Sequence, residues 1–161
     1  MRNIASLSTK LVRIGAALLV VALVSIGLTL WVTWQLAGGA AALNEAGRMR
    51  MQTWRLTSTV QAQMDETEVH LLVKQFDDSI ELLRNGDSSR PLFVPWGPVV
   101  QAQFQLVELA WQQQKAILLN RPQVDRVKLV QAADQFLLVI DSFVFSIEHQ
   151  LSSLTAILNL F

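Results

Sequence analysis

The sequence predicts an all-α protein in which an N-terminal transmembrane helix is followed by an antiparallel four-helix bundle. An uncharged, mostly apolar run occupies residues 14–36. Beyond it, apolar residues recur at the three- and four-residue spacing of amphipathic helices. The breaks between the periodic segments are short and contain Gly, Pro, Asn and Asp. Four helices joined by short links favour an up-down-up-down bundle.

Composition narrows the function classes. The chain of 161 residues carries 13 basic and 13 acidic residues, so it lacks the basic excess expected of a protein that binds nucleic acid. Hydrophobic residues make up 52% and charged residues only 16%, a balance typical of membrane proteins. Cysteine is absent. Glu66 and His70 stand at i, i+4 spacing but no third ligand is evident, so we expect neither a metal nor a cofactor.

The domain organisation follows from the uncharged run. Residues 14–36 are long enough to cross a hydrocarbon core of about 30 Å. Residues 1–13 are basic and are expected in the cytoplasm by the positive-inside rule. Residues 37–150 then form a periplasmic sensor bundle anchored in a bacterial inner (plasma) membrane. Residues 151–161 are uncharged and resemble the approach to a second span, which this sequence does not contain.

Caps and breaks predict the helix bounds. The first helix should continue from the membrane to about residue 64, and the others should cover about 66–85, 98–120 and 123 to the chain end. Asp65 and Glu68 are spaced as a capping box at the start of the second helix. Asn85-Gly86-Asp87 should end that helix, and Pro98 suits the first turn of the third.

Each helix has a predicted packing row at 3,4 spacing. The rows of the second and third helices are Val69, Leu72, Val73, Phe76, Ile80 and Leu83, and Val100, Phe104, Val107, Trp111 and Leu118, interrupted by Gln114. The row of the fourth helix is Val130, Ala133, Leu137, Ile140, Val144, Ile147, Leu151, Leu154 and Leu158. The row of the first helix is Leu43, Ala46, Arg50, Thr53, Thr57, Val60 and Met64. Arg50 is the one charged residue in these rows.

Three arginines follow the predicted span, and helical geometry separates them. Arg48 and Arg55 share a face, whereas Arg50 lies about 140° from Arg55. An arginine in a packing row needs a counter-charge. The residues leave two partners open, an acid from another helix or an anion from solution.

A two-fold dimer through the first helix would bring two copies of Arg50 together. At about 6 Å and an effective dielectric near 20 they would repel by roughly 3 kcal/mol, and an anion between them would reverse this. The planar guanidinium matches a planar oxyanion such as nitrate or a carboxylate. Gly47 would allow a ligand or a second backbone to approach closely.

A motif in this stretch carries a family likeness. It consists of Asn44, Ala46, Gly47, Arg50, Met51, Gln52, Arg55 and Leu56. This pattern, just after a first membrane helix, resembles the P-box of nitrate/nitrite sensor histidine kinases. It is similar also to the input domain of type IV pili methyl-accepting chemotaxis transducers.

The resemblance implies a ligand and its residues. Nitrate or nitrite would bind at the two-fold axis of a homodimer formed through the first periplasmic helix. Arg50 and Gly47 would hold the anion, and Arg55, Asn44 and Met51 would support the site. Some nitrate sensors resembling this chain carry a lysine where it has Glu45, and an acid there would lower the positive potential.

We therefore expect a non-enzymatic sensory input module that signals to the histidine kinase of a two-component system. The kinase core is absent from the sequence, so the module would belong to a longer kinase or stand alone. Two alternatives remain: the input domain of a chemotaxis transducer, and a structural dimerising bundle whose Arg50 forms an internal salt bridge.

Overall fold

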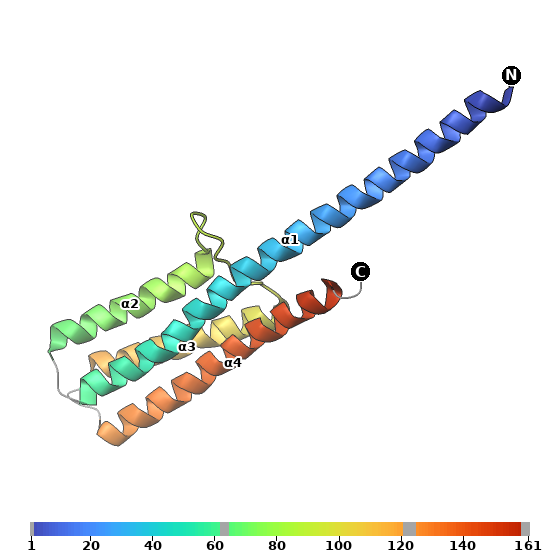
Figure 1. Ribbon diagram of the computed structural model, residues 1–161. Coiled ribbons are helices and arrows are strands. Elements are labelled where there is room, and N and C mark those ends of the chain that lie inside the picture. The colour runs from blue at the N-terminus through green and yellow to red at the C-terminus, as the bar shows by residue number, and fades with distance from the viewer. Residues whose placement is uncertain (1, 62–64, 121–124, 159–161) are drawn as a thin grey trace.

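The computed structural model describes residues 2–61, 65–120 and 125–158, and it confirms an all-α fold. Its helices are α1 (Arg2–Gln61), α2 (Glu66–Asn85), α3 (Pro98–Leu119) and α4 (Arg126–Leu158), packed as a bundle (Figure 1). The predicted bounds of the second and third helices are confirmed within one residue. The predicted end of the first helix near residue 64 and the predicted start of the fourth near residue 123 lie outside the described residues.

Helix α1 has two parts with different surroundings. Its N-terminal part projects from the bundle as a single helix, and the C-terminal end of α4 lies at the same end of the bundle (Figure 1). Side chains of this projecting part, such as Leu18, Leu23 and Leu30, are exposed. Within the described residues, Leu7–Thr59 and Arg126–Ala156 are the two helical stretches long and apolar enough to cross a membrane. The most apolar part of the first stretch is fully exposed, whereas that of the second is partly buried in the bundle, as expected for a core helix.

The core is built from the predicted rows of α2 and α3 together with aromatic residues of α4. Every apolar residue of those two predicted rows is buried, and so is Gln114. Phe76 stacks on Trp111 with ring centroids 4.0 Å apart, and Phe104 meets Phe143 at 5.4 Å. The indole N–H of Trp111 donates to Asp77 at 2.7 Å, which satisfies the polar edge of the ring.

The buried row of α4 coincides with the predicted one at every second position and lies one residue earlier at the others. It consists of Leu129, Ala133, Phe136, Ile140, Phe143 and Ile147. Ala133, Leu137, Ile140 and Ile147 of the predicted row are buried, whereas Val130, Val144, Leu151 and Leu154 are only partly covered. The side chain of Leu158 lies outside the described residues. Helix α4 is rotated so that Phe136 and Phe143 face the core, because these rings bury more apolar area than the aliphatic residues beside them.

The same displacement in α1 corrects the prediction for Arg50. The buried row of α1 is Ala42, Ala46, Met49, Thr53 and Leu56. Of the predicted row, Ala46, Thr53 and Thr57 are buried, Leu43 is partly buried, and the side chains of Val60 and Met64 lie outside the described residues. The side chain of Arg50 is 54% exposed. Arg50, which was predicted to lie in a packing row, is therefore outside the face that the bundle buries, because Met49 and Leu56 occupy that face.

Close packing joins α1 to α4 and to the loop of residues 86–97, at the end of the bundle from which α1 projects. Gly86 ends α2 with a φ of 71°, in the left-handed region that glycine adopts without strain. The ring of Phe93 lies against the backbone of Gly38, and its centroid is 4.4 Å from that of Trp34. Leu151 of α4 packs equally closely on Gly39. The two glycines thus let the loop and α4 reach the α1 backbone.

Two substitutions test this packing. Gly38→Ala would place a methyl group on the Phe93 ring, so we expect the free energy of unfolding to fall by about 1–3 kcal/mol. Gly27→Ala is the matched control, because nothing lies within 4 Å of its added Cβ and the helix should gain up to about 1 kcal/mol. Thermal unfolding of the full chain in detergent, followed by circular dichroism, measures both. A Gly38→Ala chain as stable as the Gly27→Ala chain would contradict the close contact.

Candidate ligand site on helix α1

The motif of residues 44–56 lies entirely within α1, and the structure gives its three arginines three different surroundings. Arg48 pairs with Glu45 on the side of α2. Arg50 pairs with Asp141 of α4. The side chain of Arg55 has no hydrogen bond or ion pair within the described residues. The sequence separated Arg50 from the other two arginines, and the structure adds the partner of each.

Glu45 is turned into the bundle and is balanced there. Its side chain is 5% exposed, and its Oε1 accepts a hydrogen bond from Arg48 at 2.6 Å. Arg48 also approaches the buried hydroxyl of Ser79, which donates in turn to Gln52 at 3.5 Å. Because Arg48 neutralises this carboxylate from three residues away, Glu45 lowers the potential around Arg50 much less than an unpaired acid would.

Arg50 and Asp141 form a loose pair across the α1–α4 boundary. Nε of Arg50 lies 2.9 Å from Oδ1 of Asp141, but the contact is not aligned as a hydrogen bond, and Oδ1 is buried without a donor among the described residues. The side chains are 54% and 44% exposed. Exposed pairs of this kind contribute about 1 kcal/mol or less to stability. Arg50 can therefore leave this partner at little cost.

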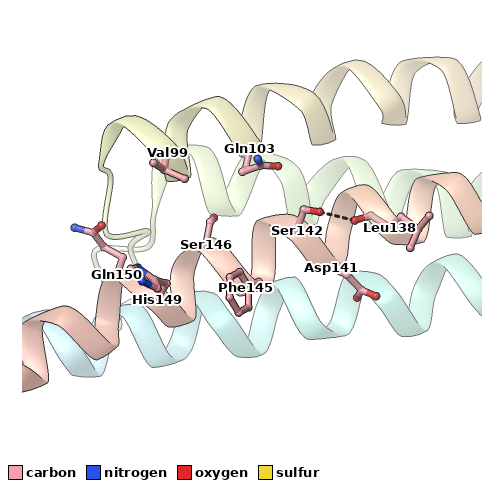
Figure 2. Close-up of a pocket in the computed structure, with 9 residues that line it drawn as sticks. All are labelled: Val99, Gln103, Leu138, Asp141, Ser142, Phe145, Ser146, His149 and Gln150. Carbon is pink, nitrogen blue, oxygen red and sulfur yellow. Dashed lines mark hydrogen bonds between the residues drawn. The ribbon is translucent and has the colours of Figure 1, made fainter.

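Figure 2 shows where Asp141 points. Its carboxylate lies on the side of α4 that faces α1, whereas Ser142 and Ser146 lie on the side that faces α3 (Figure 2). These residues, with Gln103 and His149 among others, line a hollow of about 580 Å³ between α3 and α4. Sequence reasoning missed Asp141, because its pairing with Arg50 spans two helices far apart in the chain.

A second row of α1 is exposed on the side opposite to its buried row. Its members follow 4,3,4,3,4 spacing: Ala40, Asn44, Gly47, Met51, Trp54 and Ser58. Met51 is 59% and Trp54 is 56% exposed, which is unusual for such large side chains in consecutive turns. Gly47 has nothing within 4 Å of an added Cβ, so the bundle itself does not require a glycine there. Arg50 lies about 60° from Gly47, at the edge of this row.

Arg55 lies on the other edge of that row. With Arg48, Met51 and Gln52 of α1 it lines a hollow of about 320 Å³, completed by Gln75 and Asp78 of α2. The predicted site residues are therefore divided. Asn44, Gly47 and Met51 share the exposed row beside Arg50, whereas Arg55 faces α2.

One pKa departs clearly from its ordinary value. Hydrogen bonds from the hydroxyl and the backbone N–H of Ser89 hold the pKa of Asp87 below its usual range, and Arg90 adds to the effect. These residues shape the turn after α2 and are distant in sequence from the motif. Their role is to fix the loop that carries Phe93.

Comparison with known proteins places this arrangement. A family model described as "Type IV pili methyl-accepting chemotaxis transducer N-term" matches residues 31–136, which include the whole motif. Among solved structures, the ligand binding domain of the Pseudomonas aeruginosa nitrate receptor McpN is similar, with a TM-score of 0.61 and 22% identity. The match covers 68% of this chain and 95% of that one, and it shows a shared fold. No curated protein matches the chain.

The buried Glu45 gives a test of the motif's local design. Arg48→Ala would leave the carboxylate of Glu45 buried without its donor, so we expect the free energy of unfolding to fall by about 1–3 kcal/mol. Arg55→Ala removes an equally basic side chain from the same face and should change stability by no more than about 0.5 kcal/mol. Urea denaturation in detergent measures both, and equal effects would contradict the role assigned to Arg48.

Proposed function

Because the chain belongs to the family of type IV pili methyl-accepting chemotaxis transducer N-terminal domains, we propose that it is a membrane-anchored sensory input module for nitrate or nitrite. Membership makes it a sensory ligand-binding domain of the chemotaxis-transducer type, without catalytic activity of its own. The observation that carries the choice of ligand is the pair Gly47 and Arg50. A glycine that its own bundle does not need stands beside an arginine held only by a loose ion pair.

The exposed row of α1 is the proposed dimer interface. Two copies of α1 meeting along Ala40, Gly47 and Trp54 would bury the apolar surface that each bundle leaves uncovered. Gly47 would let the two backbones approach, and each Arg50 would lie at the edge of the contact. Asn44 and Met51, on the same row, would line the space between the copies.

A planar oxyanion fits the charge of this interface. Two guanidinium groups facing one another across a two-fold axis repel, and a shared anion converts that repulsion into attraction. Guanidinium presents its donors in one plane, which matches nitrate. Support also comes from McpN, named as a nitrate receptor, whose ligand binding domain shares this fold. Arg55 faces α2 and would not contact the anion, so it would contribute only through its positive electrostatic potential.

Signalling would begin when Arg50 changes partner. In the structure, Arg50 is paired with Asp141 and ties α1 to α4. With nitrate at the interface, the guanidinium would turn toward the anion and release Asp141, which frees α4 to move relative to α1. The two helices also meet at Gly39 and Leu151, at the end of the bundle from which α1 projects. A small piston-like slide between them would carry the signal to the membrane.

The proposed placement in the cell follows from α1. Residues 14–36 would cross the bacterial inner membrane, with residues 1–13 in the cytoplasm and residues 37–150 in the periplasm. The exposed apolar part of α1 that projects from the bundle supports the span. Residues 151–161, next to the contact of Leu151 with α1, would approach the membrane again.

The output domain distinguishes two versions of this proposal. The P-box resemblance favours a histidine kinase of a two-component system, whereas the family description favours a methyl-accepting chemotaxis transducer. The DNA that follows the codon for Phe161 tests them: a kinase core supports the first version, a methyl-accepting region the second, and a stop codon neither. Ligand binding by the bundle is the same in both versions.

A purely structural bundle is less well supported. That alternative requires Arg50 to stabilise the fold through its salt bridge. The pair is half exposed and poorly aligned, so its contribution is about 1 kcal/mol or less, against roughly 3–5 kcal/mol for breaking a buried pair. The exposed Met51 and Trp54 would be covered in a dimer with or without a ligand, so the ion pair is what separates the two readings.

Nitrate affinity tests the role of Arg50 as the anion ligand. We expect Arg50→Ala to weaken nitrate binding at least about 100-fold. Each of the two copies would lose a charged hydrogen bond to the anion, and each such bond is worth about 1.5–3 kcal/mol. Lys74→Ala removes one positive charge from an exposed face of α2 and should change affinity by less than about threefold. Isothermal calorimetry on the full chain in detergent measures both. Unchanged affinity in Arg50→Ala would exclude the assigned site.

Nitrate affinity also tests whether the carboxylate of Asp141 competes with the anion for Arg50. Asp141→Asn removes the partner from which nitrate must take Arg50, so we expect nitrate to bind about two- to fivefold more tightly. Asp134→Asn is the matched control, because it neutralises an exposed acid on the same helix without an ion pair among the described residues. Weaker nitrate binding in Asp141→Asn, with Asp134→Asn unchanged, would show that Asp141 supports the ligand and does not compete with it.

A further inference from the structure

The hollow between α1 and α2 lies beside the site on the exposed row and shares Met51 with it. It has a volume of about 320 Å³ and is lined by Arg48, Met51, Gln52, Arg55, Gln75 and Asp78. Arg55 lies about 140° around α1 from Arg50, so the two guanidinium groups serve different spaces. Small-molecule sites range from about 300 to 1,000 Å³, which makes this hollow suitable for a small ligand.

The charges around the hollow are matched in number but are not all paired. Arg48 is neutralised by Glu45, as described above. Arg55 and Asp78 carry opposite charges, and neither has an ion pair or a side-chain hydrogen bond among the described residues. Neither is within salt-bridge distance of the other, although both line the same space. The hollow therefore offers one free cation and one free anion with no net charge between them.

Two other polar side chains of the hollow, those of Gln52 and Arg48, are already ordered by contacts within the bundle. Gln52 is 8% exposed, and its Oε1 lies 3.5 Å from the hydroxyl of Ser79, which shares its one proton between Gln52 and the backbone carbonyl of Gln75 at 3.1 Å. The amide N–H groups of Gln52 have no acceptor among the described residues. Arg48 is fixed from behind by the buried Glu45. A side chain that is already ordered loses less entropy when it binds a ligand. Met51 adds an apolar surface at the rim.

We propose that this hollow binds a small zwitterion, a free α-amino acid, in addition to the nitrate proposed for Arg50. The carboxylate of the amino acid pairs with Arg55 and accepts from Gln52. Its ammonium group pairs with Asp78 and donates to the side-chain oxygen of Gln75. Met51 contacts its side chain. A simple anion such as nitrate satisfies only Arg55 and is repelled by Asp78, so the hollow selects for the molecule that carries both charges.

The test is a thermal-shift screen of the full chain in detergent against each of the twenty standard amino acids at neutral pH. We expect at least one of them to raise the unfolding midpoint. Calorimetry with that amino acid should show binding that falls about tenfold or more in Arg55→Gln and in Asp78→Asn. Lys74→Gln and Glu81→Gln, exposed charges of α2 outside the hollow, are the controls and should bind as wild type.

Two further arms separate this site from the nitrate site. Acetate and methylammonium each carry half of the zwitterion and should bind at least about tenfold more weakly than the amino acid. Arg50→Ala should lose nitrate but keep the amino acid, and Asp78→Asn should lose the amino acid but keep nitrate. No midpoint shift with any of the twenty amino acids would overturn the proposal. So would amino-acid binding that survives in both Arg55→Gln and Asp78→Asn.

Discussion

Helix α1 carries two rows of 3,4 spacing on opposite faces, and the rest of the structure depends on which of them the bundle buries. One row, which includes Met49 and Leu56, is buried against the bundle. The opposite row, which includes Gly47 and Trp54, is uncovered although it has the same 3,4 spacing. Because successive residues turn by about 100°, Arg50 falls at the edge of the uncovered row and cannot enter the core. The position of Arg50 thus follows from which row the bundle takes.

In the proposed function, the weakness of the Arg50–Asp141 pair suits it to signalling. A buried and well-aligned pair would hold α1 to α4 too firmly for a small anion to compete. The observed pair is half exposed and misaligned, so the two proposed states would differ by an energy that one ligand can supply. Gly39 lets Leu151 of α4 pack closely on α1 at the end of the bundle from which α1 projects, where the proposed displacement would be passed on.

The sequence predicted the helices well and the rotation of two of them less well. Asp65 and Gly86 fixed α2, since a cap and a left-handed residue act locally. In α1 and α4 several rows have 3,4 spacing, and only the packing of neighbouring helices selects between them. The exposed row that contains Trp54 can be recognised in the sequence, because its members follow 4,3 spacing from Ala40. The pairing of Asp141 and the α1–α2 hollow cannot, because both depend on residues brought together from different helices.

The central claim is that the ligand lies between two copies of α1, held by Arg50 from each. The number of nitrate ions bound per chain tests it most directly. Calorimetry or equilibrium dialysis on the full chain in detergent, at chain concentrations well above the dissociation constant, gives this number. The account predicts one nitrate per two chains, together with a dimeric mass by light scattering. One nitrate per chain, or saturable binding to a monomer, would contradict it.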